Sequence, residues 1–260
     1  MDYLENSTAK LNRAIKHLNE FIHEADAFLA TSPFGIRVEN YEDNGAKCIR
    51  FSYNVHQDPP KALGVIAGDC IHNLRSILDN IIWSLGKIYL STDQKAKPDR
   101  LYFPVLKTEE EYKRKIETPE LIAIKQFPQS AQDLIERLQP YNGTLPAHRI
   151  SVLHALWNAD KHRSPNIVGG VGGGVSQSYN LQQPASLSAG VYIQHGREFG
   201  YGALPENGIP QGAKIEVLDM HLLFEEDGPA SRFVVSGLLS ELIEIVRDEV
   251  IYKLAPLFYR

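Results

Sequence analysis

The segment Gly68–Gly86, GDCIHNLRSILDNIIWSLG, constrains the fold more than any other part of the chain. Its apolar residues recur every three or four positions over about five helical turns, the pattern of an amphipathic helix with one buried face. The apolar arc consists of Cys70, Ile71, Leu74, Ile77, Leu78, Ile81, Ile82 and Leu85. Such a face must be buried against other elements, so the sequence predicts a helical bundle core.

The same periodicity predicts several other helices, and two regions read as β-structure. The expected helices cover residues 2–30, about 58–89, 108–117, 129–138, 147–163 and 236–258. Two β-prone runs at 36–42 and 47–55 flank Asn44–Gly45, a strong hairpin signal. The Gly- and Pro-rich region 166–235 is expected to form three to five strands. Its run VGGVGGGV lacks the Lys-Ser/Thr of a phosphate loop, so a loop or glycine-rich hairpin is expected there.

These elements predict an α+β protein. Its helical bundle core would comprise residues 1–165 and 236–260, with an N-terminal β-hairpin and a small antiparallel β-subdomain, about 166–235, inserted before the C-terminal helix. A single domain over 1–260 is expected, and a separate β-domain at about 165–230 is the alternative division.

Composition excludes several classes of protein. The formal net charge of −5 gives the whole chain no general attraction to nucleic acid or anionic membranes. Two cysteines are too few for a disulfide framework. The N-terminal segment lacks the apolar core of a signal peptide, and no apolar run approaches the roughly 20 residues of a membrane span. We therefore expect a cytoplasmic protein that does not associate with membranes.

The polar side of the helix around Gly68–Gly86 groups residues with chemical potential. His72, Arg75 and Asp79 follow one another at spacings of three and four, which stacks them on adjacent turns. Arg75 and Asp79 can pair directly, and Trp83 continues the same edge. The polar side is either a solvated surface or one half of a reactive site.

A second segment, LHALWNADKHR at 153–163, places Asp160 in the middle of an apolar helix side. A buried unpaired carboxylate costs several kcal/mol, so Asp160 should find a partner or bind a proton. Arg163 could serve on the same helix, and Arg75 or His72 could serve across the bundle. The opposite side carries three polar residues at spacings of four: His154, Asn158 and His162. The two interpretations are a buried ion pair that fixes helix docking, and a pocket shared by Asp160, Arg75 and a histidine.

Three kinds of function fit these residues. In metal-free phosphodiester cleavage, His72 or His162 would transfer protons and Arg75 would bind the phosphate. In a metal-dependent hydrolase, the ligands would be drawn from His72, Asp79, His154, Asp160 and His162, although these five residues form no H-E-x-x-H or E-x-x-H pair. In the third kind of function, the polar residues form an interface for a protein partner or for a second copy of this chain.

The two segments together resemble a family of largely uncharacterised bacterial proteins that pair an HNLRS-x-L-D-[HN] helix with an N-x-D-K-H-R helix. The resemblance covers about residues 59–163 and implies a shared fold. The first segment is also similar to the R-x-x-x-x-H signature of HEPN-type helical ribonucleases of bacterial toxin and phage-defence systems. In those proteins Arg and His meet their copies across a dimer interface and cut RNA without metal. The signature would begin at Arg75 and include Asp79, but Asn80 replaces its final histidine.

The leading expectation is thus a metal-independent endoribonuclease of the toxin or defence type, without a cofactor and acting as a homo-oligomer on RNA. Its site would consist of Arg75, His72, His162, Asp79 and Asp160. The alternatives are a non-catalytic interaction or dimerisation module with a protein partner, and a metal-dependent hydrolase with His and Asp ligands.

Overall fold

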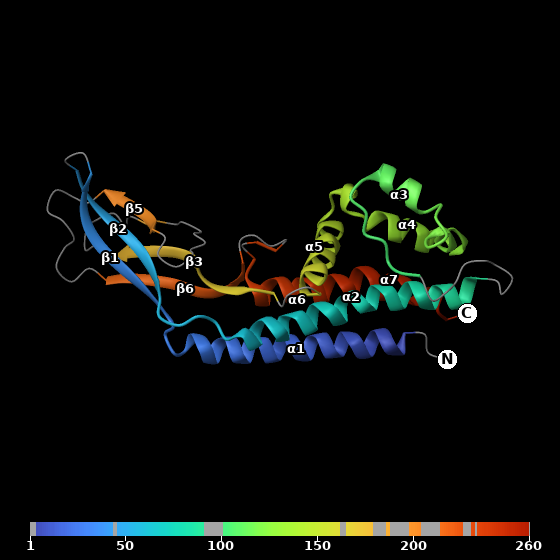
Figure 1. Ribbon diagram of the computed structural model, residues 1–260, viewed down its shortest axis with the longest axis horizontal. Helices are drawn as coiled ribbons and strands as arrows, with labels where there is room; N and C mark the ends of the chain where they lie inside the picture. The colour runs from blue at the N-terminus through green and yellow to red at the C-terminus, as the bar shows by residue number, and fades with distance from the viewer. Residues whose placement is uncertain are drawn as a thin grey trace.

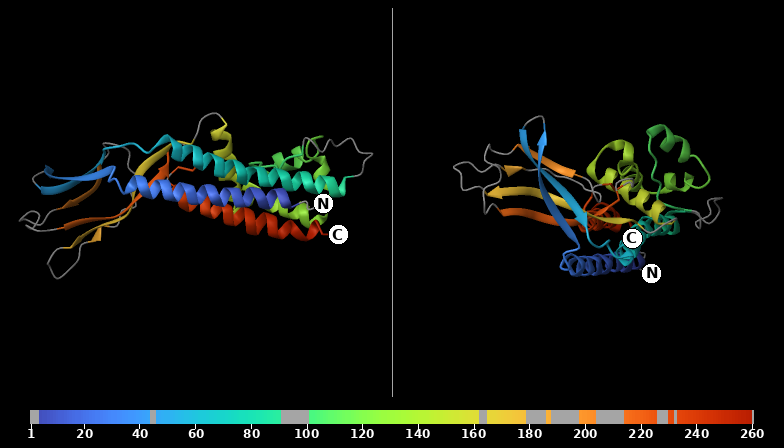
Figure 2. Two further views of the ribbon diagram at one scale, coloured as in Figure 1. Left: turned by 90° about the horizontal axis from the view of Figure 1, so that it is seen from below. Right: turned by 60° about the vertical axis from the view of Figure 1, so that its left-hand side comes forward.

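The computed structural model describes residues 4–43, 46–90, 101–161, 165–178, 186–187, 198–203, 214–225, 230–231 and 233–259. Its largest part is a three-helix body (Figures 1 and 2). The body consists of α1 (Glu5–Leu29), α2 (Lys61–Tyr89) and a C-terminal helix that starts as α6 (Val235–Ile245). That last helix continues through a π-helical segment (Val246–Ile251) into α7 (Tyr252–Leu254) and a 3₁₀ turn (Ala255–Leu257).

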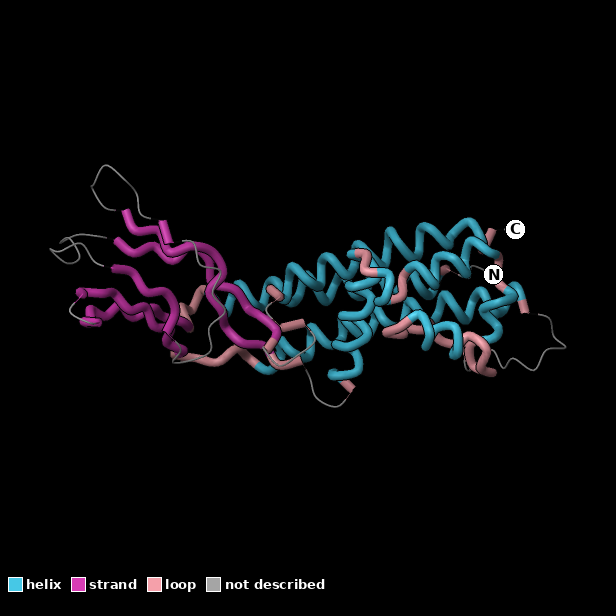
Figure 3. The backbone as a smooth tube through the Cα atoms, turned by 90° about the horizontal axis from the view of Figure 1, so that it is seen from above, coloured by secondary structure: helices cyan, strands magenta, loops and turns pink. Residues whose placement is uncertain are grey.

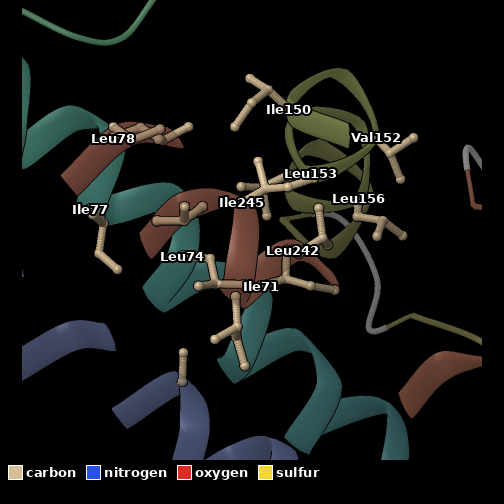
Figure 4. Packing of buried hydrophobic residues seen from close by; sticks show 14 of the residues in the cluster. Ile71, Leu74, Ile77, Leu78, Ile150, Val152, Leu153, Leu156, Leu242 and Ile245 are labelled. Carbon is tan, nitrogen blue, oxygen red and sulfur yellow. The ribbon is translucent and has the colours of Figure 1, made fainter. Parts of the chain in front are cut away.

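The apolar arc of α2 is the centre of the hydrophobic core. All eight of its predicted members are buried with 0% exposed area. Figure 4 shows Leu74 of α2 in one cluster with Leu153 of α5 (Leu145–Asp160) and Leu242 of α6, while Ile71 points toward α1. The periodicity therefore predicted the buried face of α2 correctly. Helices that lie far apart in the sequence pack against this face.

Short helices pack on one side of the body (Figure 1). They are α3 (Glu109–Lys115), a 3₁₀ turn (Ile122–Gln126), α4 (Gln129–Arg137), a second 3₁₀ turn (Pro140–Asn142) and α5. Thr144 caps α5, because its side chain accepts a hydrogen bond from the amide of Ala147. Thus α5 begins two residues before the predicted start. The predicted end at 163 lies outside the described residues.

Two three-stranded antiparallel sheets lie at one end of the helical body (Figure 3). One has the order β1 (Phe34–Asp43), β2 (Ala46–Val55), β5 (Glu198–Ala203). The other has the order β4 (Ser186–Leu187), β3 (Ile167–Ser178), β6 (Lys214–Phe224). The predicted hairpin is confirmed, with Phe34 opposite Val55 and Asp43 opposite Ala46. The α+β class with a helical core is also confirmed, but β5 of the inserted region pairs with β2 of the hairpin, which the sequence did not predict.

The glycine-rich run at 168–175 is part of strand β3 and not a loop or a hairpin of its own. A Cβ atom at Gly170 would lie 2.2 Å from Cδ1 of Leu223 on the paired strand β6. Glycine therefore lets the Leu223 side chain lie across β3, a close approach that strand propensities do not predict.

Among the described residues, none of the helices combines the length and apolar character needed to cross a bilayer.

Candidate functional site

The two predicted polar segments meet where α5 packs on α2. We name this contact the α2–α5 seam and define it by eight residues: Asp69, His72, Arg75 and Asp79 of α2, and His154, Trp157, Asp160 and Lys161 at the end of α5. Residues late in α5 lie close to residues early in this stretch of α2, and the reverse holds at the other end of the seam. Asp160 lies against the early part of this α2 stretch, and His154 interacts with Arg75 and Asp79 further along.

Arg75 is buried, with 2% of its area exposed. One guanidinium nitrogen, Nη1, lies 2.6 Å from Oδ1 of Asp79, so the predicted pair on one helix is confirmed. The other, Nη2, donates to the carbonyl of Phe103 at 2.9 Å, and the amide of Phe103 donates to Oδ1 of Asp79 at 2.9 Å. The pair thus binds both main-chain groups of one residue, as a neighbouring strand would. Arg75 has its ionic partner on its own helix, and in the described part of the chain it forms no ion pair with Asp160.

Gln139 binds the same extended segment in a similar way. Its Oε1 accepts from the amide of Leu106 at 3.0 Å, and its Nε2 donates to the carbonyls of Pro104 at 3.0 Å and Ile135 at 2.7 Å. Gln139 is fully buried. Segment 101–106 is therefore held to the helices by side chains, which gives Arg75 and Asp79 a structural role.

Asp160 lies at the other end of the seam, against Gly68. A Cβ atom at position 68 would be 2.4 Å from Oδ1 of Asp160, so the absence of a side chain there admits the carboxyl group. Burial raises the pKa of Asp160, and the negative charge of Asp69 raises it further, while His72 opposes both effects. The predicted choice of His72 as a neighbour of Asp160 fits this arrangement.

His154 has the opposite kind of environment. Burial lowers its pKa first, followed by the positive charges of Arg75 and Lys161, while Asp79 opposes them. The imidazole Nε2 lies 3.0 Å from Nδ2 of Asn158, and the buried Nδ1 has no hydrogen-bond partner among the described residues. The imidazole is therefore held neutral near pH 7. Its spacing of four from Asn158 was the only sequence signal, and it did not single His154 out as a proton-transferring group.

The remaining predicted residues differ in accessibility. His72 is exposed, and its Nε2 lies 3.5 Å from Oγ of Ser76. The Asp79 side chain keeps 31% of its area exposed beside the buried Arg75. His162 lies outside the described residues. Trp157 lies between two cations, with its ring centroid 5.1 Å from Cζ of Arg75 and 3.1 Å from Nζ of Lys161.

The predicted metal ligands form no cluster of three or more His, Cys, Asp or Glu residues within the described ranges. Comparison with protein-family models, curated proteins and solved structures finds no match to this chain. The fold and the seam therefore define the class of protein: an α+β protein with a helical core, whose two central polar segments meet between α2 and α5.

Proposed function

We propose that the α2–α5 seam is a metal-independent acid–base site that cleaves RNA, with His72 and Asp160 as the proton-transferring groups. The observation that supports this most directly is the pair of opposite pKa shifts along one seam. The pKa of Asp160 is raised and that of His154 is lowered, and the exposed imidazole of His72 acts electrostatically on Asp160. Several titratable groups with shifted pKa values along one contact are typical of functional sites.

The chemistry requires one base and one acid. His72, which solvent can reach, would take the proton from a ribose 2′-hydroxyl, and the 2′-oxygen would attack the adjacent phosphorus. The bond from phosphorus to the 5′-oxygen would break, and Asp160 in its protonated form would give that oxygen its proton. The products would be a 2′,3′-cyclic phosphate and a 5′-hydroxyl end. A raised pKa suits Asp160 to the role of acid, because more of the carboxyl is protonated than in an ordinary aspartate.

A cation is also needed for the charge that develops on the phosphate. Arg75 was expected to supply it, but its guanidinium is 2% exposed and occupied by Asp79 and Phe103. Lys161 is exposed at the end of α5 and is the described cation nearest in sequence to Asp160. In the proposed site Lys161 binds the phosphate, and Arg75 keeps α2 and segment 101–106 in position.

The test is cleavage of a fluorescent single-stranded RNA in the presence of EDTA. His72→Ala and Asp160→Asn should each reduce the rate about 100-fold or more, the usual contribution of a general acid or base. His23→Ala is the matched control, because His23 is also an exposed histidine on a long helix, α1, away from the seam. Unchanged cleavage in His72→Ala, or cleavage abolished by EDTA, would contradict the proposal.

A second function is a non-catalytic interaction or dimerisation module, favoured by the internal bonds of Arg75. The residue that the ribonuclease signature makes catalytic is buried here, and Asn80 stands where the signature has histidine. This alternative predicts no RNA cleavage by the folded wild-type protein and a mass of twice 29.2 kDa in light scattering. A monomer at all concentrations with measurable RNA cleavage would exclude it.

A further inference from the structure

A cavity of about 240 Å³ lies where the helical body meets the second sheet, away from the α2–α5 seam. Three elements form its wall: α1 near its end, β6, and the beginning of α6. The residues that decide its chemistry are Phe21, Ile22, Asp26, His221, Leu222 and Ser236.

The surface of this cavity is part apolar and part polar. Phe21 and Leu222 are almost completely buried, with 1% and 4% of their area exposed, and they provide an apolar floor. Ile22 is 38% exposed, and it lies at the same cavity. A bound molecule with an apolar part would remove Ile22 from water, which is favourable in proportion to the apolar area covered.

The polar groups of the wall determine the charge of the ligand. The lining contains one carboxylate, Asp26, together with the His221 imidazole and the Ser236 hydroxyl, and no lysine or arginine is among its described residues. The first turn of α6 also contributes, because a helix N-terminus carries the equivalent of about half a positive charge. The Asp26 side chain is exposed, and its carboxylate charge is larger than this partial charge, so the cavity favours a cation.

We propose that this cavity binds a small organic cation with a protonated amine on an apolar body. The amine would donate to the Asp26 carboxylate, and the apolar body would cover Ile22 and rest against Phe21 and Leu222. At roughly 30 Å³ per non-hydrogen atom, the share of one water in the liquid, the volume accommodates about eight such atoms. The site is independent of the acid–base function proposed above.

Benzylamine, which has eight non-hydrogen atoms and is protonated at pH 7, is a suitable probe for NMR titration of the full chain. We expect saturable binding that perturbs signals of Phe21, Ile22 and Leu222. Benzyl alcohol, with the same shape and no charge, and benzoate, with the opposite charge, should each bind at least tenfold more weakly.

Two variants distinguish the carboxylate at the cavity from charge elsewhere on the helix. Asp26→Asn should weaken benzylamine binding about tenfold or more, since one charge-assisted hydrogen bond is lost. Glu24→Gln should leave it unchanged, because Glu24 is exposed on the same helix and does not line the cavity. No saturable binding, equal binding of all three probes, or equal affinity in Asp26→Asn would each overturn the proposal.

Discussion

Removal of Asp79 should destabilise the fold much more than removal of an ordinary surface charge. In Asp79→Ala the Arg75 guanidinium stays buried without its anion, and the amide of Phe103 loses its acceptor. Breaking a buried ion pair from one side costs about 3–5 kcal/mol. The Asp79 side chain is 31% exposed, so water can reach part of the space it vacates. We therefore expect the lower end, a loss of about 3 kcal/mol in the free energy of unfolding.

Urea unfolding at pH 7 measures this loss, and Lys113→Ala is the matched control. Lys113 and Glu109 form the same kind of pair, four residues apart on a helix, but their side chains are 67% and 57% exposed. Its loss should change stability by no more than about 0.5 kcal/mol. A loss in Asp79→Ala as small as the control's would refute the assignment of Asp79 to a structural clamp.

A double variant separates the ion pair from the clamp on Phe103. Replacing a buried pair by apolar residues often restores stability. In Arg75→Met/Asp79→Leu, however, both main-chain groups of Phe103 lose their partners, at about 1–3 kcal/mol for each group left buried. The double variant should therefore remain destabilised by roughly 2 kcal/mol or more, with faster hydrogen exchange at the Phe103 amide. Wild-type stability and unchanged exchange would show that Phe103 is held by other contacts.

Three further predictions concern the rest of the seam. Gly68→Ala should lower the free energy of unfolding by about 1–3 kcal/mol in urea, since the new Cβ would displace the Asp160 carboxyl group. Gly237→Ala is the control and should not destabilise the protein, because its new Cβ would meet its nearest atom at 4.0 Å. Because the pKa of Asp160 is raised on folding, the folded state binds this proton more tightly, and stability is lost as pH rises above 3.8. Asp160→Asn should therefore gain stability relative to wild type between pH 4 and 7. Absence of this gain would contradict the raised pKa. The pKa of His154 is shifted in the opposite direction, so its contribution to stability is present above pH 6.5 and is lost as pH falls. NMR titration should place the midpoint of His154 below 6.5, and a midpoint at or above 6.5 would be inconsistent with its burial beside Arg75.

The periodicity of apolar residues predicted most of the helices, because the buried face of α2 is marked by residues that lie close together in the sequence. The apolar arc from Cys70 to Leu85, the hairpin around Asn44–Gly45 and the Arg75–Asp79 pair all depend on residues close in sequence. Contacts between distant segments were not predictable in the same way. The pairing of β5 with β2 joins residues about 150 positions apart, and the Leu223 side chain of β6 lies across β3 at Gly170, where it leaves no room for a Cβ atom.

The burial of Arg75 shows the same limit at the candidate site. On a helical wheel Arg75 lies at the border of the polar side, and its neighbours His72 and Asp79 favoured an exposed or reactive position. Its burial depends on Phe103, which arrives from a segment 28 residues later and supplies a carbonyl for the second guanidinium nitrogen. Likewise, the pKa of His154 is lowered by its burial and by the charge of Arg75 on α2, neither of which its own helix reveals.

These contacts determine which substitution tests the proposed chemistry. Arg75→Ala removes an ion pair, a hydrogen bond to Phe103 and a buried side chain, so activity should fall with the loss of folded protein, whatever the reaction. His72 is exposed, and its one described hydrogen-bond contact is a long one, to Ser76. Substitution of His72 should therefore change the free energy of unfolding by no more than about 0.5 kcal/mol, the usual range for a surface site. A large fall in RNA cleavage without a fall in stability can then be assigned to proton transfer, and a parallel fall in both would place His72 with Arg75 among the residues that hold α2 in place.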